Sequence, residues 1–224
     1  MHQTPPFDAP AARRLREALG MAPGHVAYGL RAQYGLLVTP DVVAAWERGL
    51  QAPSARELTA LAGVLWCSPG DLMIEAVTLR EHRLAKGMAP EDVARQVGMD
   101  AGTYLKAEES GRWRGNERQS VALAEALALT PAAFLTATGR DGELAGILRS
   151  AVTTRWQAHV RATAKLVPIP RDALEKVLEQ LHSDYQARMV TTLSWGSTEA
   201  AGTGDAGRQF LDSIVVRFWE LAGG

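Results

Sequence analysis

The chain has 224 residues, of which 46% are hydrophobic and 22% are charged. This composition is that of a globular protein and excludes a chain that is disordered throughout. Lys and Arg number 24 against 25 Asp and Glu, so the basic excess typical of nucleic-acid-binding proteins is missing. The two signs also balance locally, with 6 basic and 7 acidic side chains in residues 1–77, 8 and 8 in 78–139, and 10 and 10 in 140–224. Any nucleic-acid site must therefore be a local patch.

The single cysteine, Cys67, excludes an intramolecular disulfide and a zinc site built from several cysteines. It fits a reducing compartment. The first ten residues lack the cationic and apolar regions of a signal peptide, and no run approaches the roughly 18 apolar residues of a membrane span. We therefore expect a cytoplasmic protein with no membrane partner.

A sequence repeat organises the first two thirds of the chain. The pattern Gly-Met-Ala-Pro-x-x-Val-Ala begins at Gly20 and again at Gly87, with six of its eight positions identical. Four shorter matches accompany it in the same order: Leu-Arg-Glu at 15–17 and 79–81, Glu-x-Gly at 47–49 and 109–111, Leu-Ala at 61–62 and 123–124, and Ser/Thr-Pro at 68–69 and 130–131. We expect an N-terminal tail (1–9), two copies of one module (10–76 and 77–138) and a different C-terminal domain (139–224).

The first copy predicts five short helices. Apolar spacing indicates helices near 11–19 and 54–66, and three more begin at prolines, a favoured first helical residue: Pro23, Pro40 and Pro69. Thr39 and Ser68 precede two of these prolines as N-caps. The first copy is about five residues longer than the second around 31–38, and the additional residues should lengthen the second helix or the turn after it.

The second copy predicts the same order of helices. They lie near 78–86, from Pro90, after an Asp100 cap, near 117–129, and from Pro131. Gly87 and Gly98 are placed to end the first two helices in the left-handed conformation.

The C-terminal part begins with a linker at 139–142. We expect three helices after it, near 143–166, near 171–195 and near 208–221, the second with a heptad-like apolar seam. Each has an apolar stripe, which should pack against the other two helices or against a second subunit. Residues 196–207 are small, polar and glycine-rich, which predicts a loop. Residues 202–207 match GxGxxG literally, but they follow a helix, so dinucleotide binding is not expected.

The repeated pattern resembles the Cro/CI repressor-like (xenobiotic response element) helix-turn-helix family over about 130 residues. The matching residues are Val93-Ala94, Val97-Gly98-Met99, Glu108-Glu109-Ser110-Gly111 and Leu123-Ala124 in the second copy, and Val26-Ala27, Trp46-Glu47-Arg48-Gly49 and Leu61-Ala62 in the first. The resemblance implies an all-α fold of two tandem five-helix lambda-repressor-like helix-turn-helix modules, followed by a C-terminal helical bundle.

The resemblance also implies a sequence-specific transcriptional regulator that binds double-stranded DNA as a dimer joined through 139–224. In such modules the third helix enters the major groove and the flanking segments hold phosphates. In the second module the helix would present Ala101, Gly102, Thr103 and Lys106, and Arg112, Arg114, Asn116 and Arg118 would follow as phosphate ligands. The register after Lys106 stays open by one residue, because Glu108 and Glu109 both fit.

The first module offers fewer donors. Thr39, Arg48 and Gln51 lie in or next to its third helix, and Gln33 lies near the end of its second helix. Pro23 and Pro90 stand where the family usually has a phosphate-binding glutamine. That departure and the near-neutral charge favour an alternative, a protein-interaction scaffold whose modules have partly or wholly lost DNA binding.

A second alternative is a ligand-responsive regulator with the C-terminal helices as sensor, and the effector, a small molecule or a protein, is unknown. No sequence pattern combines a nucleophilic side chain with a general base, as a catalytic site for covalent catalysis would. The five histidines are not spaced as metal ligands. We therefore expect no enzyme activity, no catalytic residues, no metal and no cofactor.

Overall fold

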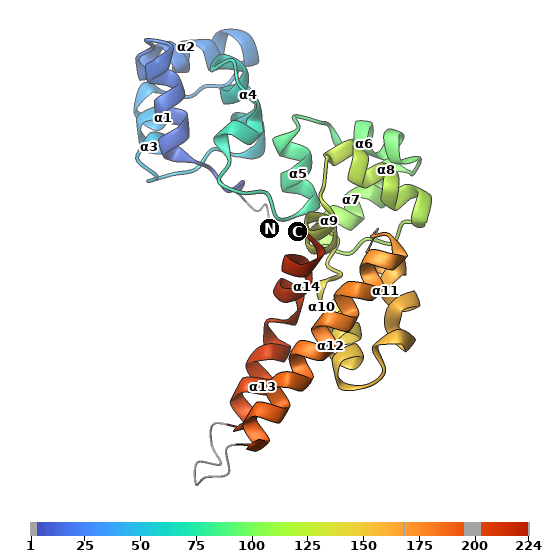
Figure 1. The fold of residues 1–224 in the computed structure, drawn as a ribbon. Helices are drawn as coiled ribbons and strands as arrows, with labels where there is room; N and C mark the ends of the chain where they lie inside the picture. Colours follow the sequence, from blue (N-terminus) through green and yellow to red (C-terminus); the bar gives the residue numbers. More distant parts are fainter. Residues whose placement is uncertain (1–3, 168, 195–202, 224) are drawn as a thin grey trace. The chain divides into compact units, whose positions relative to one another are not determined.

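The computed structural model describes residues 4–167, 169–194 and 203–223, and they are all-helical apart from turns and connections. The chain divides into two compact units, Met1–Ala128 and Leu129–Gly224 (Figure 1). The first unit contains both sequence copies. We call residues 9–76 the first repeat and residues 77–128 the second repeat.

The first repeat begins with four α-helices. They are α1 (Ala9–Ala18), α2 (Pro23–Tyr34), α3 (Pro40–Glu47) and α4 (Ala55–Val64), and the short 3-10 helix η1 (Pro69–Leu72) follows. The predicted fifth helix is thus a single 3-10 turn. Local capping explains the boundaries, because the side chains of Thr39, Ser54 and Ser68 accept hydrogen bonds from the first turns of α3, α4 and η1. The core between the helices includes Val26, Leu30, Trp46 and Leu58, all buried.

Residues 5–8 are not a tail, contrary to the expectation from sequence. Asp8 caps α1, which begins at Ala9, and its backbone N–H donates to the Leu72 carbonyl at 2.8 Å. Phe7 forms an antiparallel bridge with Met73 and packs against the core of the first repeat. Phe7 and Asp8 are therefore held by Leu72, at the end of η1, and by Met73, which follows it.

The second repeat contains four helices in the same order, α5 (Leu79–Ala85), α6 (Pro90–Val97), α7 (Ala101–Ser110) and α8 (Glu117–Leu127). Gly87 and Gly98 have φ of 64° and 73°, which confirms the predicted left-handed ends of α5 and α6. The next helix, α9 (Pro131–Ala137), belongs to the second unit, because Leu135 lies in the core of that unit. The compact unit thus ends at Ala128, ten residues before the expected boundary.

A buried ion pair joins the first and third helices of the first repeat. Arg16 of α1 donates from Nε to Oε1 of Glu47 at 2.6 Å and from Nη2 to Oε2 at 2.8 Å. Its remaining nitrogen, Nη1, donates to the Met21 carbonyl at 2.7 Å. The hydrogen bonds with Glu47 raise the pKa of Arg16. This bidentate geometry fixes the rotation of α3 against α1.

The second repeat contains the same ion pair at the same place in its fold. Arg83 of α5 donates to both oxygens of Glu108 in α7, at 2.6 and 3.0 Å, and to the Met88 carbonyl at 2.9 Å. Burial lowers the pKa of Arg83, but the hydrogen bonds and charge of Glu108 outweigh burial, so that this pKa is raised.

The ion pairs correct two alignments made from sequence. Arg16 corresponds to Arg83, so the Leu-Arg-Glu matches at 15–17 and 79–81 are three residues out of register with the Gly-Met-Ala-Pro match. Glu47 corresponds to Glu108, which settles the choice between Glu108 and Glu109. The alignment shifts by one residue because Gly111, which ends α7 with positive φ, lies three residues after Glu108, whereas Gly49 lies only two residues after Glu47.

The additional residues of the first repeat lengthen both α2 and the turn after it. Helix α2 has 12 residues against 8 in α6. Its last residue, Tyr34, lies against Gly63 of α4, where a Cβ atom would overlap the tyrosine ring and hydroxyl. Gly29 makes a second close approach, since its Cβ would lie 3.0 Å from Val64. The absence of side chains at these two positions lets α2 pack closely on α4.

The second unit differs from the expected three long helices. The helix expected at 143–166 is divided into α10 (Asp141–Thr153), the 3-10 helix η2 (Trp156–His159) and α11 (Val160–Leu166). Next come α12 (Arg171–Ser194), α13 (Thr203–Asp212) and α14 (Ile214–Ala222), so the helix expected at 208–221 is also divided, at Ser213. Residues 203–207 of the expected loop are helical, and 195–202 lie outside the described residues.

The apolar stripes of the second unit pack against one another. Helices α10, α12 and α14 lie side by side (Figure 1) and bury Leu148, Leu178 and Phe218. Phe210 of α13 is also fully buried, and the guanidinium of Arg217 lies 4.9 Å from its ring centroid. Of the two packing modes left open by the sequence, packing within one chain accounts for these stripes. No single helix of the described residues is long and apolar enough to cross a membrane.

Candidate nucleic-acid interface

Helix α7 has one buried and one exposed face. Tyr104 and Ala107 point into the repeat, and Glu108 is held by Arg83. Gly102, Thr103 and Lys106 occupy the exposed face. The helix follows α6 after only three residues, 98–100, and Asp100 caps it by accepting a hydrogen bond from the Thr103 N–H at 2.9 Å. A short turn and a good cap thus present the first turns of α7 to solvent.

The buried side of α7 is polar as well as apolar. The Tyr104 hydroxyl is fully buried beside the Arg83–Glu108 pair, and none of the described residues forms a hydrogen bond of regular geometry with it. Burial first, and then the charge of Glu108, raises the pKa of Tyr104. The tyrosine therefore stays neutral, and the ion pair is the charged link that orients α7.

A surface hollow of about 1060 Å³ lies along the exposed face of α7 and the segment that follows it. Four of the residues predicted to bind DNA line it together: Thr103, Lys106, Arg112 and Arg114. The structure thus brings together side chains from α7 and from the 111–116 segment. Asn116 and Arg118 are not among the lining residues.

The basic side chains of this region have no acidic partners. Lys106, Arg112, Arg114 and Arg118 are exposed, and within the described residues none of them forms an ion pair. Two carboxylates also line the hollow, Asp100, which caps α7, and the exposed Glu109. The cations therefore outnumber the carboxylates locally, although the chain as a whole is nearly neutral.

Asn116, predicted to bind phosphate, also forms hydrogen bonds within the first turn of α8. Its Oδ1 accepts the Gln119 N–H at 2.9 Å, and Gln119 Oε1 accepts the Asn116 N–H at 3.0 Å. This reciprocal capping box begins α8. The capping box uses the side-chain oxygen of Asn116 and not its NH₂ group.

The predicted residues of the first repeat do not form a comparable cationic surface. Thr39 caps α3, and Arg48 donates from Nε to the Ala44 carbonyl at 3.0 Å. Gln51 is exposed in the segment before α4, and Gln33 is exposed on the additional turn of α2. In the register set by the ion pairs, Ala45 stands where the second repeat has Lys106. Helix α3 contains no Lys or Arg at all.

Sequence reasoning missed Trp113 and Gln119, which also line the hollow. Trp113 is buried between two exposed arginines, and a charged-apolar-charged triplet followed by glycine was the available signal. Comparison of the chain with protein-family models, with curated proteins and with solved structures finds no match.

Proposed function

We propose that this protein is a sequence-specific regulator of transcription that binds double-stranded DNA through its second repeat. Helices α6 and α7 with their three-residue turn would form a helix-turn-helix of the Cro/CI type, and α2 and α3 its counterpart in the first repeat. The observation that carries the proposal is the cluster of unpaired cations at the exposed face of α7.

The chemistry of each side chain suggests its role. Lys106 lies on the exposed face of α7, where an ammonium group can donate to guanine O6 and N7 in the major groove. Arg112, Arg114 and Arg118 lie beyond the helix and suit phosphate oxygens, which position a protein without reading sequence. Thr103 adds a hydroxyl to the same surface.

In this proposal the first repeat does not read bases. Its third helix lacks a basic residue, and Asp41 in its first turn would repel phosphate. One chain then supplies one reading helix, and a two-fold operator needs two chains. We propose that the second unit joins them. Because its apolar stripes are buried within the unit, the contact would use exposed residues such as Val190 and Val216.

The test is DNA binding across a salt series, measured by fluorescence anisotropy with an enriched and a random duplex. About 4 to 8 neutralised phosphates predict a slope of about −4 to −7 for log affinity against log salt. Lys106→Ala should weaken binding to the enriched duplex by about 1 to 3 kcal/mol and reduce its preference over the random duplex. Arg114→Ala should reduce the steepness of the salt dependence by about 1.

Matched controls come from the first repeat. Arg48→Ala and Gln51→Ala should leave both affinity and slope unchanged. Salt-independent, millimolar binding by the parent protein would contradict DNA binding altogether. Equal losses in the two repeats would contradict the assignment to the second repeat alone.

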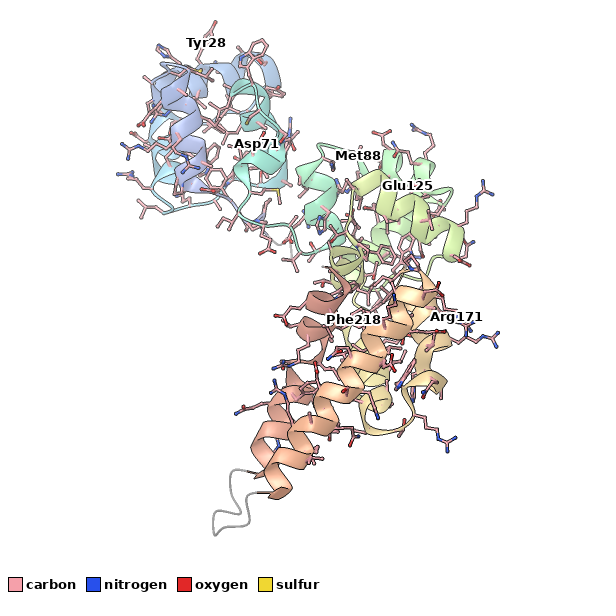
Figure 2. All side chains as sticks on the ribbon, viewed as in Figure 1. Tyr28, Asp71, Met88, Glu125, Arg171 and Phe218 are labelled. Atoms are coloured by element: carbon pink, nitrogen blue, oxygen red, sulfur yellow. The ribbon has the colours of Figure 1, made fainter. Side chains whose placement is uncertain are left out.

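One observation favours protein interaction as the role of the first repeat. Several large apolar side chains there are exposed, including Leu37 at 84% and Tyr28 at 75%, and Figure 2 shows Tyr28 projecting outward from α2. Exposed apolar groups of this kind are typical of contact surfaces. If no duplex binds, this second candidate function, a protein-interaction scaffold, is the one to pursue.

A further inference from the structure

The segment between α7 and α8 is anchored by a single tryptophan. Trp113 is only 8% exposed, while Arg112 and Arg114 on either side of it are exposed. The indole Nε1 donates to the Ser120 hydroxyl of α8 at 2.9 Å. Gly115 lies against the indole so closely that a Cβ atom would overlap the ring. Burying the tryptophan therefore places both arginines at the surface.

The anchor continues into a chain of hydrogen bonds. The Ser120 hydroxyl donates to the Asn116 carbonyl at 2.9 Å, and Asn116 shares the capping box with Gln119. The side-chain Nε2 of Gln119 then donates to the carbonyl of Gly98, in the turn between α6 and α7, at 3.1 Å. The same network thus connects the arginine segment, the start of α8 and the turn before α7.

The first repeat keeps the cap but lacks the rest of this network. Ser54 and Glu57 form a capping box at the start of α4, as Asn116 and Gln119 do at the start of α8. However, Glu57 has no amide to donate. Counted from the two caps, Leu58 stands at the position of Ser120, and Gln51 at that of Trp113. The network therefore occurs only in the repeat that has two arginines, Arg112 and Arg114, between its third and fourth helices.

We propose that Trp113, Ser120 and Gln119 are positioning residues that hold the 111–116 segment ready for DNA, so that Arg112 and Arg114 reach phosphates without first being ordered. The inference rests on the proposed DNA-binding function. Ordering flexible side chains and loops on binding weakens affinity, and holding them beforehand removes that cost. The positioning residues touch no phosphate themselves.

A double-mutant cycle distinguishes positioning from a general structural role. Ser120→Ala should weaken binding about threefold to tenfold, the range for reordering one or two long side chains. It should leave the salt slope unchanged, because both arginines still reach their phosphates. In the Arg112→Ala, Arg114→Ala background, Ser120→Ala should have no effect, since no arginine is left to position.

Conservative and matched variants control the cycle. Ser120→Thr keeps the hydroxyl and should bind within about twofold of the parent. Thr59→Ala removes a comparable hydroxyl from α4, where it donates to the Ala55 carbonyl, and should not change binding. Gln119→Ala tests the far end of the network and should repeat the result of Ser120→Ala.

A second readout needs no DNA. Trypsin cleaves after arginine, so Ser120→Ala and Gln119→Ala should speed cleavage after Arg112 and Arg114 in the folded protein, while Thr59→Ala should not. Unchanged cleavage, no loss of affinity, or the same loss with and without the two arginines would each overturn the inference. Parent protein that binds no duplex would overturn the proposed function itself, and this inference with it.

Discussion

The two repeats of the first unit share their buried contacts and differ in their exposed ones. In each repeat an arginine of the first helix forms a bidentate ion pair with a glutamate of the third helix. Its Nη1 donates a hydrogen bond to the backbone carbonyl of a methionine. On the exposed side, the third helix of the second repeat contains Lys106 and is followed by Arg112 and Arg114, whereas that of the first contains Asp41 and no Lys or Arg. The comparison indicates that the orientation of the third helix is independent of what that helix presents.

The largest expected effect comes from breaking the shared ion pair. Arg83→Met leaves Glu108 buried and uncompensated, and it should destabilise the second repeat by about 3 kcal/mol or more. Arg16→Met should have a similar effect on the first repeat, because its glutamate is almost as buried. Urea unfolding followed by circular dichroism measures the loss, and hydrogen exchange of the amides of α3 and α7 assigns it to a repeat.

Removing both charges provides the control for the ion pair. Arg83→Met combined with Glu108→Leu should recover most of the lost stability, since a buried pair of apolar residues often replaces a buried ion pair without loss. A loss of less than about 1 kcal/mol in unfolding free energy for either single variant would show that the pair is hydrated in solution. It would contradict the claim that this ion pair orients the third helix in both repeats.

An intermediate effect is expected where the first repeat differs structurally from the second. Gly63→Ala places a Cβ against Tyr34 and should cost about 1 to 3 kcal/mol through overpacking. The matched position in α8 is the exposed Glu125, labelled in Figure 2, where substitution by alanine should change stability by less than about 0.5 kcal/mol. Thermal unfolding of both variants tests the contrast. Equal effects would mean that α2 does not pack closely on α4.

The smallest expected effect concerns two equivalent helix ends. Trp66 after α4 and Ala128 after α8 have positive φ, at 57° and 52°. Glycine avoids the steric cost of this conformation, although it gains freedom in the unfolded chain. Trp66→Gly and Ala128→Gly should each stabilise by about 0.5 to 1 kcal/mol. Trp66 is 87% exposed, so its loss removes little burial. Lower stability of either variant would contradict the prediction.

Much of the local structure is predictable from sequence. Thr39, Ser68 and Asp100 cap their helices as expected, and the prolines at 23, 40 and 90 begin theirs. These contacts span only a few residues, so the sequence pattern contains them almost completely. Of the candidate site, Thr103, Lys106, Arg112 and Arg114 do share one hollow.

Other features were not predictable because they depend on contacts between distant residues. The Leu-Arg-Glu match suggested a wrong register, since a short identical string does not reveal which arginine faces the glutamate. The helix expected at 143–166 is divided, and the chain turns between α10 and α11 so that the apolar residues of both pack into one core. Hydrophobic periodicity alone does not predict such a turn. The roles of Trp113 and Gln119 likewise require the turn at Gly98 to lie beside α8.

The sequence by itself determined that the chain is helical and where most helices begin, because caps and periodicity act over a few residues. It also showed, by its repeated motifs, that the first unit contains two repeats. Tertiary structure decided which residues carry equivalent roles in the two copies, that α9 joins the second unit, and that four predicted side chains meet at one surface. Those outcomes depend on burial and on hydrogen bonds between residues far apart in the chain, and only the packed core brings such residues together.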